Sequence, residues 1–151
     1  MSPFRQLFRK TLPFLLVAWL FFIFGTSSTV VRPNEFFALI QQVFQLDENS
    51  LNGFQVFWGA AWLLIVKCWH FTEFAVLLLL CVGSLRWLTG SLSQSKILAA
   101  SVFCIVFAAS DEWHQTFIPD RYGTLWDVGV DSLGVALATL WCLSRLPRKI
   151  D

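Results

Sequence analysis

Charged side chains are scarce in this sequence. Only 14% of its 151 residues are Asp, Glu, Lys or Arg, while 56% are hydrophobic. Soluble domains carry about 25% charged residues, which keep their surfaces in contact with water. The scarcity therefore excludes an ordinary soluble domain and indicates a surface covered mostly by lipid. We expect membrane lipids as partners, and no nucleic acid.

The sequence also lacks a cysteine framework. Its four cysteines lie far apart within apolar stretches, and no Cys-x-x-Cys pair occurs. Isolated cysteines of this kind behave as small buried hydrophobic side chains. We therefore expect neither a disulfide framework nor a cysteine-based zinc site. Because no soluble domain, repeat or low-complexity tail is apparent, residues 1–151 are expected to form a single transmembrane domain.

Four apolar stretches are long enough to cross a bilayer, which needs about 20 residues. They predict an all-α polytopic membrane protein. The basic residues before the first stretch also resemble the start of a signal peptide. We favour an uncleaved helix, because apolar residues continue to Val31. The expected spans are 12–31, 67–87, 97–114 and 126–146.

Two further segments are expected outside the spans. Apolar residues recur at helical spacing over 35–46, with glutamines between them, which is typical of an amphipathic helix on the outer membrane surface. Asn34 is expected to cap this helix. As one helix, residues 54–87 would be about 50 Å long, more than the hydrocarbon core of about 30 Å. We therefore expect a break near Lys67, with a re-entrant or interfacial piece over 54–66.

The basic residues predict the orientation in the cell membrane. Lys and Arg in short loops are retained on the cytoplasmic side. If both termini are cytoplasmic, eight of the eleven basic residues lie inside. Most acidic residues and both histidines then lie toward the outer side. The eight are Arg5, Arg9, Lys10, Arg86, Lys96, Arg145, Arg148 and Lys149.

Ionisable residues gather at the outer ends of the expected spans. A charged group within the hydrocarbon region costs about 2.5–3.5 kcal/mol on insertion scales, so such groups need partners or a water-filled cavity. They are therefore candidate functional residues. The candidates for catalysis are His70, Glu73, Asp111, Glu112, Gln115, Asp127 and Asp131, and those for substrate binding are Lys67, Arg121, His114 and Ser28.

The spacing of the first candidates places them on one helix face. Lys67, His70 and Glu73 are three residues apart, which predicts a polar stripe. The alternative is that Lys67 only extends to the membrane interface and His70 only bonds a neighbour. For Ser28 and the hydroxyl residues beside it, the alternative is hydrogen bonding to their own helix.

The later candidates suit proton transfer. Asp111 and Glu112 are adjacent carboxylates, which can act as acid and base. Arg121 is a natural counter-ion for carboxylates, since Arg pairs with them bidentately. Asp127 and Asp131 share a face, and Asp127 could instead be a helix cap.

Gly134, one turn further along, would let this last face pack closely against another helix. We expect the six residues His70, Glu73, Asp111, Glu112, Arg121 and Asp131 to line one cavity open to the outer side. A metal site from His70, Glu73 and His114 lacks a recognised ligand spacing. We therefore expect no metal and no cofactor.

These residues resemble the motifs of VanZ-like membrane proteins. Residues 67–71 match Lys-x-x-His-Phe, and residues 110–121 match Ser-Asp-Glu-x-x-Gln-x-Phe-x-Pro-x-Arg. Residues 127–134 resemble Asp-x-x-x-Asn-x-x-Gly. Two positions depart from the pattern: Asp120 stands where the family often has Gly, and Asp131 stands where it has Asn. The added negative charge puts a shared substrate preference in doubt.

The resemblance implies a biological setting and no defined reaction. VanZ is associated with resistance to teicoplanin, a lipid-tailed antibiotic that acts on cell-wall precursors. The first hypothesis is an enzyme at the outer leaflet, acting on a lipid-linked envelope substrate. In it, Asp111 or Glu112 is acid or base, His70 moves protons and Arg121 anchors phosphate or carboxylate.

The second hypothesis is a protein that binds or shields a lipid-tailed antibiotic, or its target, without turnover. A transporter or proton channel is disfavoured, because the inner halves of the expected spans are nearly uncharged. The stretches 74–85 and 135–143 illustrate this, since neither contains Asp, Glu, Lys or Arg.

Overall fold

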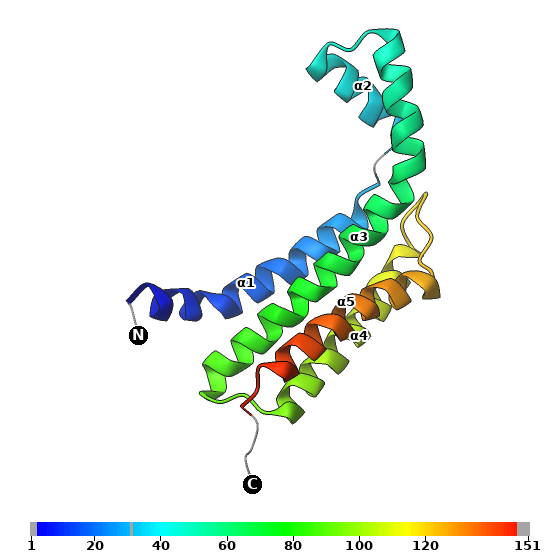
Figure 1. Cartoon of the computed structure of the whole chain (residues 1–151). Coiled ribbons are helices and arrows are strands. Elements are labelled where there is room, and N and C mark those ends of the chain that lie inside the picture. The colour runs from blue at the N-terminus through cyan, green and yellow to red at the C-terminus, as the bar shows by residue number, and fades with distance from the viewer. Residues whose placement is uncertain (1–2, 31, 148–151) are drawn as a thin grey trace.

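The computed structural model describes residues 3–30 and 32–147, and within these ranges it is all-helical. All helices except α2 are long and apolar enough to cross a membrane. The prediction of an all-α protein with four such helices is therefore confirmed. In chain order the helices are α1 (Pro3–Ser28), α2 (Pro33–Phe44), α3 (Glu48–Thr89), α4 (Gln94–Gln115) and α5 (Leu125–Ser144) (Figure 1).

A four-helix bundle is formed by α1, α4, α5 and the second half of α3. In this bundle α3 packs most extensively on α5 and also contacts α1 and α4 (Figure 1). The buried core is small, as expected where lipid covers the outer faces. Its fully buried apolar side chains are Ile23, Phe74, Leu77, Leu78, Ile97, Cys104, Ala108 and Val135.

The expected break near Lys67 is wrong, because α3 runs through this residue without interruption. No proline lies within its 42 residues, so nothing in the sequence forces the helix to end. At 1.5 Å per residue the helix is about 63 Å long. Its first half extends past the bundle instead of breaking (Figure 1).

The short helix α2 packs against this projecting half of α3. Phe36 stacks on Trp58 with 4.7 Å between ring centroids, and Phe37 meets Phe54 edge to face at 6.0 Å. Asn34 does not cap the helix as expected. Arg32 occupies the N-cap position without a side-chain hydrogen bond, because Pro33 already begins the helix.

Side-chain caps begin the other three helices that follow a loop. Asp47, Ser93 and Thr124 occupy the N-cap positions of α3, α4 and α5, and each accepts a hydrogen bond from the backbone N–H three residues later. The hydrogen bonds from Ser50 lower the pKa of Asp47 below its usual value.

The two ends of the bundle differ in chemistry. The start of α1 and the end of α5 lie toward one end (Figure 1). Arg86, Lys96 and Arg145 lie at the same end, in the last turn of α3, the first turn of α4 and just after α5. We call the opposite end, where α1 and α4 finish and α5 begins, the polar end. Arg148 and Lys149 lie outside the described residues. The orientation of the bundle in the membrane stays a prediction.

Candidate functional site

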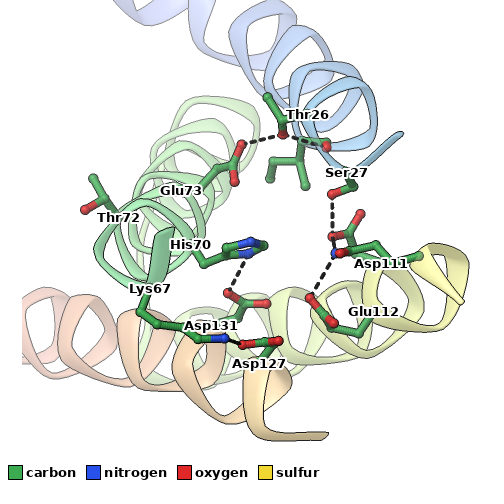
Figure 2. Close-up of polar contacts among 12 residues, drawn as sticks. Thr26, Ser27, Lys67, His70, Thr72, Glu73, Asp111, Glu112, Asp127 and Asp131 are labelled. Atoms are coloured by element: carbon green, nitrogen blue, oxygen red, sulfur yellow. Dashed lines mark hydrogen bonds and ion pairs between the residues drawn. The ribbon is translucent and has the colours of Figure 1, made fainter. Parts of the chain in front are cut away.

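Polar side chains from all four bundle helices converge at the polar end (Figure 2). Those of α1, α4 and α5 lie within about two turns of the helix ends, whereas those of α3 lie near the middle of this longer helix, where it enters the bundle. We call this group the polar cluster. Figure 2 labels Thr26 and Ser27 of α1, Lys67, His70 and Glu73 of α3, Asp111 and Glu112 of α4, and Asp127 and Asp131 of α5. Gln115 of α4 and Arg121 of the α4–α5 loop complete the cluster through their hydrogen bonds.

Gln115 joins the two adjacent carboxylates of α4. Its Nε2 donates to Asp111 Oδ2 at 3.1 Å and to Glu112 Oε1 at 2.9 Å. Asp111 Oδ2 also accepts from Ser27 Oγ at 2.6 Å, and Glu112 Oε2 accepts from the backbone N–H of Thr124 at 3.0 Å. Both carboxylates are buried, so these bonds replace the water they lose.

Glu73 connects α3 to α1. Its Oε1 accepts from Thr26 Oγ1 at 2.9 Å, and its backbone carbonyl accepts from Trp19 Nε1 at 3.0 Å. These two bonds hold the last turns of α1 against α3. The first expected span is therefore part of the site, since its serine and threonine reach two different carboxylates.

His70 faces Asp131 across the interface between α3 and α5. The distance from His70 Nδ1 to Asp131 Oδ1 is 3.4 Å. Asp131 is completely buried, and among the described residues neither of its carboxylate oxygens accepts a hydrogen bond. The close packing expected at Gly134 is confirmed, because this residue lies against the backbone carbonyl of Phe71.

Lys67 forms an ion pair with Asp127, half-buried between α3 and α5. Lys67 therefore has a specific partner and does not simply extend to the interface. Asp127 is not the helix cap, since Thr124 occupies that position. Instead, Asp127 Oδ2 accepts a hydrogen bond from Thr124 Oγ1 at 2.9 Å.

Arg121 is not the counter-ion of the carboxylates that we expected. Its guanidinium donates to Gln115 Oε1 at 3.0 Å and to the backbone carbonyls of Thr26, at 2.9 Å, and Thr29. In the part of the chain that the structure describes, no carboxylate pairs with it. The α4–α5 loop carries Arg121 to the end of α1, where unpaired carbonyls and the helix dipole favour a cation.

A cavity of about 960 Å³ opens beside the cluster. Its polar lining includes Lys67, His70, Glu73, Gln115 and Arg121, and its apolar lining comes mainly from aromatic and aliphatic side chains of α1 and α3. The expectation of one cavity lined by six residues is thus only partly met. His70, Glu73 and Arg121 reach the cavity, whereas Asp111, Glu112 and Asp131 lie buried behind it.

Two candidate residues lie apart from the cluster. The ring of His114 packs on Phe24, with 4.5 Å between ring centroids. Ser28 Oγ donates to the carbonyl of Phe24 at 2.7 Å, which is the hydrogen bonding to its own helix considered above. Neither residue lines the cavity.

Thr26 was missed by the sequence reasoning, which also named Ser28 as the candidate in place of Ser27. The spacing of residues in the sequence of α1 could have identified both. Trp19, Ile23, Thr26 and Ser27 recur at helical spacing and form the face that α1 turns toward the bundle. Ser28, the next residue after Ser27, lies about 100° further around the helix and therefore outside this face.

The cluster carries more negative than positive groups. It has five carboxyl groups, and its permanent cations are Lys67 and Arg121 alone. A buried carboxylate without a cationic partner either binds a proton or binds another cation. The arrangement can therefore hold and move protons, or coordinate a positively charged ion.

A sequence model of the VanZ/LLP1 family matches residues 12–146. The match covers α1 from residue 12 onward, the other three bundle helices in full, and every residue of the polar cluster. No curated protein and no solved structure matches the chain. The resemblance drawn from the sequence motifs is confirmed, and the chain belongs to the VanZ/LLP1 family.

Proposed function

We propose that this protein binds a cell-envelope lipid or lipid-linked precursor with an anionic headgroup at the outer leaflet and hydrolyses a glycosidic or phosphoester bond in it. In this step water adds to the headgroup, the leaving oxygen departs as an alcohol, and residues of the polar cluster take the proton from water and return one to the leaving oxygen. Such an activity would give tolerance to glycopeptide or lipopeptide antibiotics that act on the same precursors. The observation that carries the proposal is the cavity, which combines an apolar wall with a wall of cationic and titratable groups.

The apolar wall suits a lipid tail. Phe21 and Phe22 of α1 and Trp62 and Trp69 of α3 line the cavity. These side chains also face the outside of the bundle, since Phe21 is 73% exposed and Trp69 is 48% exposed. An acyl or prenyl chain can therefore follow one apolar surface from the surrounding lipid into the cavity.

The cationic wall suits a phosphate or carboxylate. Arg121 hydrogen-bonds only neutral acceptors among the described residues, so its positive charge is not offset by a neighbouring carboxylate. Arginine binds such anions through two parallel N–H groups. Lys67 lies on the same cavity wall, although Asp127 already pairs with it.

His70 and Glu73 are the groups placed to exchange protons with a bound headgroup. Both line the cavity, and each has a partner on a neighbouring helix. His70 faces Asp131, and Glu73 accepts a hydrogen bond from Thr26. Asp111 and Glu112 are displaced from the cavity, so we assign direct contact with the headgroup to His70 and Glu73.

The distribution of basic residues supports the outer-leaflet location. Arg86, Lys96 and Arg145 lie at the end of the bundle opposite to the polar end. If this end is cytoplasmic, as the rule for short basic loops predicts, the cavity opens toward the outer side. Leu125 and Trp126, which are 89% and 75% exposed, would then meet the outer interface.

Lipid analysis of expressing cells tests the activity. We expect mass spectrometry of the envelope lipids to show a modified species with the wild-type chain, lost in His70→Ala and Glu73→Gln. His114→Ala is the matched control, because its ring packs on Phe24 outside the cavity. An envelope lipid profile unchanged by the wild-type chain contradicts a catalytic role.

A non-catalytic protein that shields a lipid-tailed antibiotic or its target is the second candidate. It is favoured by the exposed apolar side chains of α2, among which Val43 and Phe44 are 63% and 65% exposed. In that case Glu73→Gln would leave protection unchanged and no modified lipid would accumulate. Val43→Ser together with Phe44→Ser would lower both antibiotic binding and protection in the same proportion.

A further inference from the structure

We propose that His70, Glu112 and Asp131 form a binding site for one divalent transition-metal ion behind the cavity. These residues come from α3, α4 and α5, and they offer one imidazole nitrogen and two carboxylate oxygens that lie within 4.8 Å of one another. The argument for metal binding does not depend on the function proposed above. Only its part in headgroup chemistry rests on the function proposed above.

Asp131 is the first observation that points to a cation. Its side chain is 0% exposed, and neither carboxylate oxygen accepts a hydrogen bond within the described part of the chain. An uncompensated buried carboxylate costs several kcal/mol in real proteins. A bound cation would satisfy both its charge and its free lone pairs.

The distance between His70 and Asp131 is the second observation. Nδ1 and Oδ1 are 3.4 Å apart, and neither atom makes a hydrogen bond in the described residues. Two ligands bound tetrahedrally to one zinc ion at about 2.0–2.1 Å are about 3.4 Å from each other. The two atoms therefore already have the separation of a ligand pair.

The third ligand is held in place by hydrogen bonds of its own. Glu112 Oε1 accepts from Gln115 Nε2 at 2.9 Å, and Oε2 accepts from the backbone N–H of Thr124 at 3.0 Å. Each carboxylate oxygen has two lone pairs, so each can still bind a metal. Groups that hydrogen-bond a ligand in this way orient it and strengthen metal binding.

Local charge also favours a divalent ion. Lys67 is paired with Asp127, and Arg121 contacts neutral acceptors. No permanent cation in the described residues therefore pairs with Glu112 or Asp131. One divalent ion would neutralise both carboxylates and leave His70 as an uncharged ligand, so Glu73 alone would exchange protons with the headgroup while the metal is bound.

The ligand types indicate which metals fit. Imidazole suits Zn²⁺ and other late transition metals, carboxylates suit Mn²⁺ as well, and Mg²⁺ and Ca²⁺ prefer oxygen ligands throughout. Three protein ligands leave a coordination position open, as in catalytic zinc sites. Because His70 also lines the cavity, that open position would polarise a phosphate oxygen of the bound headgroup.

Metal titration of the full chain tests the site. The protein is purified in detergent, stripped with a chelator and titrated separately with Zn²⁺, Mn²⁺ and Mg²⁺, with binding and Tm both recorded. We expect one Zn²⁺ or Mn²⁺ per chain, weaker binding of Mg²⁺, and a Tm that rises with added metal because the ion binds only the folded chain.

Four variants make the assignment specific. Affinity should fall more than about 100-fold in His70→Ala and Asp131→Asn, and about 10- to 100-fold in Gln115→Ala, which removes a bond that orients Glu112. His114→Ala, the control, should bind metal as the wild type does. Asp131→Asn keeps the shape of the side chain, so its metal-free Tm shows whether lost binding reflects lost folding.

Absence of stoichiometric binding, or Asp131→Asn binding as tightly as wild type, overturns the metal site; His70 and Asp131 are then an ordinary ion pair. Binding lost equally in His114→Ala also overturns it. Lipid binding measured on the chelated protein separates this outcome from failure of the proposed function. Arg121→Gln should lower lipid binding by the chelated protein. In the separate metal titration, the same variant should bind metal as the wild type does.

Discussion

Gly134 of α5 lies against the backbone carbonyl of Phe71 in α3. A Cβ placed on this glycine would be 2.1 Å from the carbonyl oxygen, closer than real side chains approach. The contact lets the two helix backbones meet directly, as small residues do in membrane helix pairs. It also sets the distance between His70 and Asp131, which lie within one turn of the contact on these two helices.

Gly134→Ala should therefore force α5 away from α3. We expect a loss of about 1–3 kcal/mol in the free energy of unfolding, typical of overpacking, measured by reversible unfolding in mixed micelles. Gly129→Ala is the control on the same helix, because a Cβ there meets nothing within 4 Å. That change should stabilise α5 slightly, since Ala is the better helix former. Equal effects of the two substitutions would contradict the close contact.

The Lys67–Asp127 ion pair should contribute to the packing of α3 on α5. In a double-mutant cycle with Lys67→Met and Asp127→Asn, we expect a coupling energy of about 1–3 kcal/mol, because the pair is half-buried. Arg32 and Glu35 form the matched exposed pair, for which about 0–0.5 kcal/mol is expected. Coupling of the buried pair no larger than that of the exposed pair would contradict this prediction.

Adjacent serines on α1 should differ in their effect. Ser27 is buried and donates to Asp111, whereas Ser28 donates only to the carbonyl of Phe24 in its own helix. Ser27→Ala should lower the free energy of unfolding by about 1–3 kcal/mol, because a buried carboxylate loses a donor. Ser28→Ala should change it by less than about 0.5 kcal/mol. A larger effect of Ser28→Ala than of Ser27→Ala would contradict the finding that the Ser27 face of α1 packs against the bundle.

Asp120→Gly should stabilise the α4–α5 loop. Asp120 has φ of 63°, a left-handed conformation that costs L-residues about 1–2 kcal/mol and costs glycine little. Allowing for the greater chain entropy of glycine, we expect a gain of about 0.5–1 kcal/mol. Asp120→Ala removes the charge and keeps the Cβ, so it should give no gain. A gain in both variants would assign the effect to charge instead of backbone conformation.

The left-handed conformation at position 120 also explains why the sequence motif often has glycine there. VanZ-like proteins often have glycine at this position, which suits a residue with positive φ. The sequence showed the departure as an added negative charge. Its conformational meaning required the backbone angle.

The all-α fold and the four long apolar helices could be predicted from the sequence. The length of an apolar stretch and the cost of an ionisable group in lipid are properties of a short segment. For the same reason the gathering of Glu73, Asp111 and Asp131 at one end of the bundle was predictable. The uninterrupted course of α3 through Lys67 was not predictable in this way. The thickness of a bilayer limits the length of a span, but it does not by itself end a helix.

The partners within the polar cluster depended on how the helices rotate and approach. Ser27 and Asp111 are 84 residues apart, and Lys67 and Asp127 are 60 apart, so no local pattern relates them. A rotation of α1 by one residue would exchange Ser27 for Ser28. Tertiary packing therefore determined which carboxylates lie buried and which face the cavity, because hydrogen-bond partners are set by the contact between helix faces and not by position along the chain.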